Sequence, residues 1–246
     1  MLQPGLTDLG HEVVGLDLPG RGGDLEVDCT DPAAVDAAVS EVRPDAVVHL
    51  AGIPTESSLP DALCSHVVST GAVLEAMVRH GVPRLVYASS NHAVGRTPRT
   101  GSLAVDVAPR PDTFYGVAKV AAEALMRLYA DRHGIDAVAA RIGSFLPEPT
   151  TRRQLGSWLS HADGVRMVQA SLTTPSPGFA VLYGISANTR AWWDLAPGRT
   201  LGYEPQDDAE PYAAAIEREP ETEQDRAEAA HVGGPYATGE LERPAF

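Results

Sequence analysis

The sequence predicts an α/β fold in which a doubly wound parallel sheet carries helices on both faces. Two observations support this fold class. Short apolar runs of strand length alternate with longer segments of helical periodicity through the first two thirds of the 246 residues. Most of these runs end in small or polar residues, as expected at the carboxyl edge of a parallel sheet, where ligands bind. We assign residues 1–150 to this core and residues 151–246 to a smaller C-terminal part of the same compact unit.

Each predicted strand is a short, buried, apolar run bounded by turn residues. The strands are expected at residues 12–17, 25–28, 45–51, 84–89, 136–142 and 179–184. Predicted helices start after capping residues such as Asp31-Pro32 and stop at Gly81 and Gly134. They are expected at residues 2–9, 32–42, 61–80, 112–133, 154–171 and 209–216. Residues 217–228 form a charge run without apolar periodicity, which predicts a solvated tail or linker.

The composition excludes several classes of protein. With 33 acidic and 19 basic residues the formal net charge is -14, so the chain lacks the basic face that nucleic acid or an anionic membrane surface requires. The two cysteines, Cys29 and Cys64, imply no disulfide framework and favour a reducing cytoplasm. We expect neither a signal peptide nor a membrane span, and the isolated histidines predict no metal site.

The basic residues are 18 arginines and a single lysine, Lys119. Tyr115 lies four residues before it on the predicted helix 112–133, so both side chains project from one face. A neighbouring ammonium favours the phenolate of a tyrosine, whose ordinary pKa is about 10, and so brings a base within reach of neutral pH. Guanidinium suits carboxylate binding but not this tuning. The pair therefore predicts Tyr115 as a general base.

A second polar motif, Ser89-Ser90-Asn91-His92, follows the predicted strand 84–89. A hydroxyl there can orient the substrate oxygen that Tyr115 deprotonates. A serine at a strand end followed by Tyr-x-x-x-Lys is the arrangement of short-chain dehydrogenases. The resemblance extends further, over roughly residues 12–209. The chain resembles bacterial NAD-dependent uronate dehydrogenases, of the NAD-dependent epimerase/dehydratase group, in the segments SSNHAVG (89–95), RPDTFYGVAK (110–119), RIGSFLPEP (141–149), SWLSHAD (157–163) and SANTRAWWD (186–194).

This resemblance implies a Rossmann-type fold and a role for each matching residue. Tyr115 is the expected base, Lys119 lowers its pKa and holds the nicotinamide ribose, and Ser90 completes the triad. Residues expected to contact the sugar acid are Asn91, His92, Ser144 and Arg153. A bidentate guanidinium clamp on the substrate carboxylate makes physical sense at Arg153, although the neighbouring Arg152 is the alternative. The implied reaction oxidises glucuronate or galacturonate at C1 to an aldarolactone, and a homo-oligomer is left open.

The expected cofactor is NAD. Asp17 closes a strand, where a carboxylate binds the adenosine ribose hydroxyls and repels a 2′-phosphate. Asp28 is expected at the adenine or as a helix cap, and Ala51 and Gly52 at the end of the next strand are also expected to contact the cofactor. No glycine-rich turn precedes Asp17. We therefore expect the natural product to start about 20 residues upstream, the length of a strand, turn and helix start, without which the sheet has a gap.

Two further positions depart from the pattern, since His66 stands where extended short-chain dehydrogenases carry Asn, and Pro54 where a serine is expected. Two alternatives to the dehydrogenase stay open. One is a nucleotide-sugar epimerase or dehydratase on the same scaffold, which needs a longer C-terminal part. The other is a non-catalytic dinucleotide-sensing protein without a phosphate loop.

Overall fold

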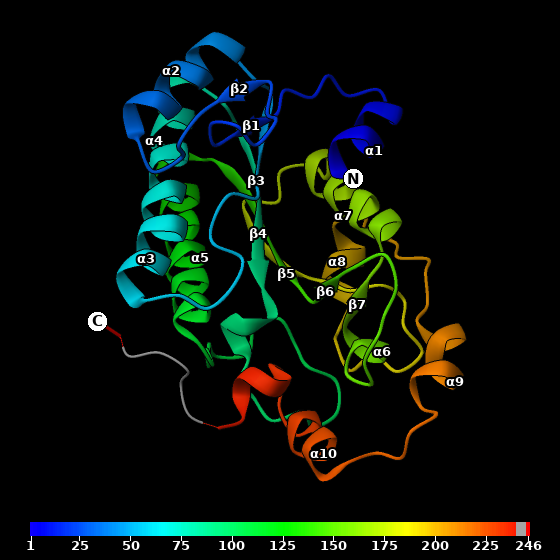
Figure 1. Cartoon of the computed structure of the whole chain (residues 1–246). Helices are drawn as coiled ribbons and strands as arrows, with labels where there is room; N and C mark the ends of the chain where they lie inside the picture. Colours follow the sequence, from blue (N-terminus) through cyan, green and yellow to red (C-terminus); the bar gives the residue numbers. More distant parts are fainter. Residues whose placement is uncertain (240–244) are drawn as a thin grey trace.

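A four-stranded parallel sheet forms the centre of the computed structural model, which describes residues 1–239 and 245–246. The strands are β3 (Ala46–His49), β4 (Arg84–Ser90), β5 (Asp136–Ile142) and β8 (Phe179–Gly184), in the order β3-β4-β5-β8 (Figure 1). In this register Val48 lies beside Val86, which lies beside Val138. The predicted parallel α/β architecture is confirmed, and all four strands point their carboxyl ends toward the same edge.

The first two strands form a separate parallel pair. β1 (Leu16–Asp17) and β2 (Leu25–Glu26) bond to each other, and within the described part of the chain neither is hydrogen-bonded to β3. The expected gap in the sheet is therefore present. The predicted strand 12–17 is reduced to its last two residues, because only these find a partner strand.

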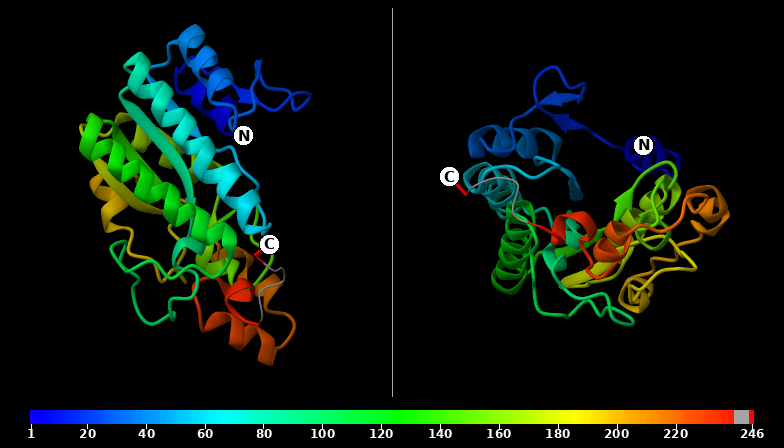
Figure 2. Two further views of the ribbon diagram at one scale, coloured as in Figure 1. Left: turned by 90° about the vertical axis from the view of Figure 1, so that its left-hand side faces the viewer. Right: turned by 60° about the horizontal axis from the view of Figure 1, so that its bottom comes forward.

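Helices cover both faces of the central sheet (Figures 1 and 2). On one face α2 (Pro32–Val42), α4 (Ser69–His80) and α5 (Phe114–His133) enclose the larger apolar cluster, in which Leu74, Met77 and Leu85 are fully buried. On the other face α7 (His161–Thr173) packs with α1 (Leu2–Asp8) against β4, β5 and β8. Gly81 and Gly134 end α4 and α5 in the left-handed conformation at φ 72° and 70°, as predicted.

Shorter elements complete the fold. They are α3 (Leu59–Leu63), η1 (Cys64–Val68), η2 (Asn91–Val94), β6 (Ser144–Phe145), α6 (Gln154–Ser157), β7 (Trp158–Leu159), α8 (Ala196–Thr200), η3 (Glu210–Tyr212), α9 (Ala213–Ile216), α10 (Glu223–Ala229) and η4 (Gly234–Ala237). No helix in the described ranges is long and apolar enough to cross a membrane.

The helix predicted at 61–80 is confirmed, since α3, the π-helical turn η1 and α4 follow one another without a break. Two other expectations about local structure were wrong in part. The helix predicted at 154–171 is two helices, because β7 pairs with β6 between them and the Ser160 hydroxyl then accepts the amide of Asp163 to start α7. The charge run 217–228 is solvated as expected, with no buried residue, but it is not a structureless tail, since it contains most of α10, which begins with a capping box at Thr222.

Candidate active site

A cavity of about 680 Å³ opens at the carboxyl edge of the sheet, a size that suits a small-molecule ligand. It is lined by all the residues predicted to contact substrate and by the predicted base, namely Ser90, Asn91, His92, Tyr115, Ser144 and Arg153. Residues far apart in the sequence thus converge on one site from β4, η2, α5, β6 and the segment before α6. The predicted cofactor residues do not line this cavity.

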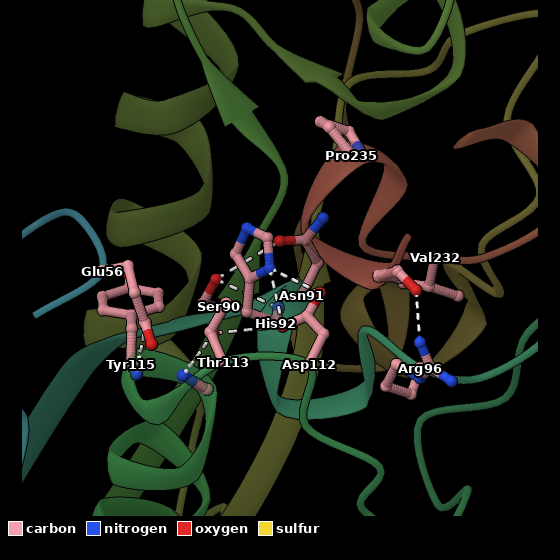
Figure 3. Close-up of polar contacts among 12 residues, drawn as sticks. Glu56, Ser90, Asn91, His92, Arg96, Asp112, Thr113, Tyr115, Val232 and Pro235 are labelled. Carbon is pink, nitrogen blue, oxygen red and sulfur yellow. Dashed lines mark hydrogen bonds and ion pairs between the residues drawn. The ribbon is translucent and has the colours of Figure 1, made fainter. Parts of the chain in front are cut away.

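The first turn of α5 fixes the position of Tyr115. The Thr113 hydroxyl accepts the amide of Gly116 at 2.9 Å and caps the helix. The Glu56 carboxylate, from the loop after β3, accepts the amides of Phe114 at 2.9 Å and Tyr115 at 3.1 Å (Figure 3). These bonds satisfy the otherwise unpaired amides of the helix start, so the backbone of Tyr115 is held in place. Sequence reasoning did not identify Glu56.

Burial raises the pKa of the Tyr115 phenol above 10, and hydrogen bonding to Ser90 acts in the opposite direction. Ser90 ends β4, where its hydroxyl accepts the amide of His92 at 3.2 Å and donates to Asn91 Oδ1 at 3.3 Å. The serine and the tyrosine therefore face one point in the cavity, where a substrate hydroxyl can meet both.

Lys119 lies beneath the cavity and is almost fully buried. Its Nζ donates to the carbonyl of Ala88 at 2.6 Å and stands 5.2 Å from the centroid of the Tyr115 ring. Burial lowers the pKa of Lys119 to about 7, while the charge of Glu123 raises it. The lysine is thus close to its protonation midpoint at neutral pH, and its ammonium form lies beside the ring of the predicted base.

A hydrogen bond to Asp112 fixes the orientation of His92. Its Nδ1 donates to the Asp112 carboxylate at 2.9 Å, and the Asp112 side chain is fully buried. Since a carboxylate only accepts, Nδ1 carries the proton and Nε2 is left for a ligand. Asp112 fits between Gly95 and Gly233, where an added Cβ would come within 1.9 Å and 1.7 Å of Oδ2. The ring of Tyr236 from η4 packs edge-on against His92.

Two buried donors in the cavity have no partner among residues 1–239 and 245–246. One is Asn91 Nδ2, from the side chain that shares its Oδ1 with Ser90. The other is Nε of Arg153, whose Nη2 donates to the carbonyl of Val232 at 2.9 Å. Because an unsatisfied buried donor costs about 1–3 kcal/mol, both groups favour a ligand that accepts hydrogen bonds.

The structure distinguishes Arg153 from its neighbour. Arg152 forms an ion pair with Glu217 at 3.0 Å and also donates to the carbonyl of Glu219. Its guanidinium is already occupied by protein groups. Arg153, with burial lowering the pKa of its guanidinium, is the better candidate for a carboxylate clamp.

The predicted cofactor residues lie at the ends of β1, β2 and β3. Asp17 is exposed and uses Oδ1 to accept the amide of Leu18 at 2.7 Å, which leaves Oδ2 available for ribose hydroxyls. Asp28 accepts the amide and hydroxyl of Thr30, which lower its pKa. Gly52 has φ 146°, and a Cβ there would lie 2.1 Å from the His66 ring. These groups fit a dinucleotide, although no described residue before β1 supplies a glycine-rich turn for its diphosphate.

Comparison with known proteins identifies the family. Residues 2–162 match the NAD dependent epimerase/dehydratase family. A uronate dehydrogenase from Pseudomonas putida is 37% identical over 222 residues, which cover 89% of this chain and 82% of that protein. The chain belongs to the NAD-dependent epimerase/dehydratase family.

Solved structures of the family agree with this assignment. A glucuronic acid dehydrogenase from Chromohalobacter salexigens superposes with a TM-score of 0.90 at 34% identity, covering 97% of this chain and 92% of the other. A uronate dehydrogenase mutant from Agrobacterium tumefaciens, complexed with NAD, superposes with a TM-score of 0.83 at 37% identity, covering 94% of this chain and 86% of the other. The Rossmann-type fold implied by the sequence is therefore confirmed.

His66, where Asn is expected in this family, lies on the π-helical turn η1. Its Nε2 bonds to the Ile53 carbonyl at 2.9 Å, and its ring contacts Tyr115 edge-on with centroids 5.2 Å apart. Burial is the main cause that lowers the pKa of His66 to about 4, so the ring is neutral at neutral pH. It links the loop after β3 to the helix that carries the predicted base.

Proposed function

We propose that this protein oxidises a cyclic hexuronic acid, such as glucuronate or galacturonate, at C1 with NAD as the acceptor and forms the aldarolactone. One observation carries the proposal. A single cavity brings Tyr115 and Ser90 together with the buried, incompletely bonded guanidinium of Arg153. The similarity to uronate dehydrogenases over most of the chain supports this substrate class.

In the proposed reaction Tyr115, as phenolate, takes the proton of the C1 hydroxyl. The Ser90 hydroxyl turns from Asn91 Oδ1 to donate its hydrogen bond to the same oxygen and orients it. The C1–O bond becomes a carbonyl as the C1–H bond breaks. NAD, when bound, supplies the acceptor for the hydride from C1. The sugar thus loses one proton and one hydride, which balances its conversion to the lactone.

Lys119 has two roles in this proposal. Its ammonium, beside the Tyr115 ring, stabilises the phenolate, and its Nζ would hold the nicotinamide ribose. A lysine with a pKa near 7 can also lose its charge when the tyrosine is neutral. At the other end of the cofactor, Asp17, with Asp28, Ala51 and Gly52 nearby, would hold the adenosine.

Arg153 positions the sugar through its acidic group. We assign the C6 carboxylate to the guanidinium of Arg153, whose Nε has no hydrogen-bond partner in the described part of the chain and whose Nη2 donates to the carbonyl of Val232. The ring hydroxyls then meet Asn91 Nδ2, His92 Nε2 and the Ser144 hydroxyl. This polar lining surrounds the sugar from η2 on one side and β6 on the other.

Formation of NADH with glucuronate and galacturonate, followed at 340 nm, tests the proposal. Tyr115→Phe should abolish the signal, because it removes the proton acceptor. Tyr129→Phe is the matched control on the same helix, since Tyr129 bonds to Glu75 on the outer surface. If the protein binds NAD but forms NADH with neither glucuronate nor galacturonate, the proposal is rejected.

The same assay separates the alternatives. Turnover of a nucleotide sugar without net NADH would favour an epimerase or dehydratase, and NAD binding with no turnover would favour a sensing protein. We also propose a cytoplasmic location, supported by Cys29 and Cys64 remaining thiols.

A further inference from the structure

Arg99 is a second arginine at the cavity that no part of the proposed reaction uses. It lies on the loop after η2, and its guanidinium stacks on the Trp192 ring with Cζ 3.4 Å from the centroid. Stacking holds the guanidinium plane through its face and leaves the N–H groups on its edges for other partners. Burial alone lowers the pKa of Arg99, and in the described part of the chain no carboxylate acts against that effect.

The other arginines of the cavity wall are already paired. Arg190 bonds to Glu210 at 2.7 Å and to Glu217 at 2.7 Å, and Arg152 shares Glu217. Glu217 is therefore taken by these two arginines and does not compensate Arg99. Within the described ranges, Arg99 and Arg153 are the arginines of the cavity lining that form no ion pair.

The two arginines are held by the same short segment. The carbonyl of Ala230 accepts the backbone amide of Arg99 at 2.8 Å, and the carbonyl of Val232 accepts Nη2 of Arg153 at 2.9 Å. Between them, His231 forms an isolated antiparallel bridge with Pro98. This segment thus contacts both arginines, which line the same cavity although 54 residues separate them in the sequence.

Arg99 and Arg153 carry like charges, which repel each other. Burial is the main cause that lowers the pKa of Arg153, and the charge of Arg99 acts in the same direction. The charges of Asp112 and Glu228 act against this shift without forming an ion pair with Arg153 among the described residues. An anion between the two guanidiniums relieves this repulsion and satisfies donors on both. A carboxylate has about four lone-pair sites, and a single bidentate arginine uses two of them. The other two lone-pair sites of the substrate carboxylate thus remain free to accept hydrogen bonds from Arg99.

We propose that Arg99 is a specificity-determining residue that binds the sugar carboxylate together with Arg153 and selects uronic acids over neutral aldoses of the same ring. The proposal rests on the proposed function and extends it. A neutral CH₂OH group at the same position carries no charge for the two guanidiniums to bind, so Arg99 strengthens binding of the acid and not of the neutral sugar.

The test compares Arg99→Gln with wild type on glucuronate and glucose. A hydrogen bond to a charged group is worth about 1.5–3 kcal/mol, so kcat/KM for glucuronate should fall about 10- to 150-fold. For glucose kcat/KM should stay within about twofold, so the acid preference falls with it. Arg127→Gln is the matched control, because Arg127 pairs with Asp131 on the exposed side of α5.

A binding measurement keeps this test independent of turnover. Glucarate, a dicarboxylate without an oxidisable C1 hydroxyl, is titrated calorimetrically onto the protein. Arg99→Gln should weaken glucarate binding at least tenfold, and Arg99→Lys should restore part of the loss through its charge. Equal glucarate affinity in wild type and Arg99→Gln, or an unchanged glucuronate-to-glucose ratio, would overturn the proposal. Loss of uronate oxidation in wild type would instead reject the proposed function, while the calorimetric comparison still decides the role of Arg99.

Discussion

Replacing Lys119 by methionine should stabilise the protein more at pH 6 than at pH 9. The folded protein lowers the pKa of Lys119 from 10.5 to about 7, because the ammonium is buried. Between these two values the unfolded chain binds the proton that the folded chain releases, so the stability of the wild type falls as the pH falls from 10.5 toward 7. Methionine is neutral at every pH and is free of this effect.

The size of the effect follows from the pKa difference. For these pKa values, lowering the pH from 9 to 6 costs the wild type about 3 kcal/mol through this group alone. The methionine variant also loses the bond to the Ala88 carbonyl, but that loss is the same at both pH values. The advantage of the variant should thus be about 3 kcal/mol larger at pH 6 than at pH 9.

Urea unfolding at the two pH values, followed by tryptophan fluorescence, measures this difference. All other titratable groups are present in both proteins, so their contributions to the pH dependence of the unfolding free energy cancel in the comparison. Parallel pH profiles for wild type and Lys119→Met would refute the reasoning, since they would mean that Lys119 is fully charged in the folded state. Lys119→Arg keeps its charge at both pH values, so it should be less stable than wild type and should lose most turnover.

Three further predictions follow from single contacts. Glu123→Gln should lower the free energy of unfolding by about 3–5 kcal/mol, because it leaves the buried guanidinium of Arg141, now 2.7 Å from the carboxylate, without its counterion. Gly116→Ala should destabilise the protein and lower turnover, because its Cβ would lie 2.4 Å from the carbonyl oxygen of His92. Asp17→Asn should raise the NADP-to-NAD ratio of kcat/KM about tenfold, since it removes the charge that repels a 2′-phosphate.

Each of these predictions has a control or a contrary result. Glu75→Gln makes the same charge change on the exposed side of α4, where urea unfolding should show a much smaller loss than for Glu123→Gln. Gly71→Ala, whose Cβ would meet its nearest neighbour at 3.6 Å, should stabilise α4 by up to about 1 kcal/mol. An Asp17→Asn variant with unchanged cofactor preference would remove Asp17 from the cofactor site.

The central strands and the main helices were predictable because local signals specify them. β5 contains an apolar run at residues 137–140 that is buried on both faces, and glycine in the left-handed conformation ends α4 and α5. The strand predicted at 12–17 was too long, because a strand exists only where another strand bonds to it. Whether a segment pairs depends on a second strand that lies beside it, and the residues of the segment itself do not reveal that strand.

The charge run shows the same limit for helices. Residues 217–228 have no apolar periodicity, and Glu217 at their start pairs with Arg152 and Arg190, which lie far away in the sequence. The site residues with a recognisable motif do lie in one cavity. Glu56, Asp112 and Arg99 were not identified, because each acts through a contact that only the folded chain brings about.

Transfer of deuterium from C1 of the sugar tests the central claim most directly. Glucuronate carrying deuterium at C1 is incubated with the protein and NAD, and the reduced nicotinamide and the sugar product are analysed by mass spectrometry. Our account predicts one deuterium in each reduced nicotinamide, none at C1 of the lactone, and a rate slower than with unlabelled glucuronate. Deuterium retained in the sugar, or reduced nicotinamide without it, would contradict a hydride transfer from C1.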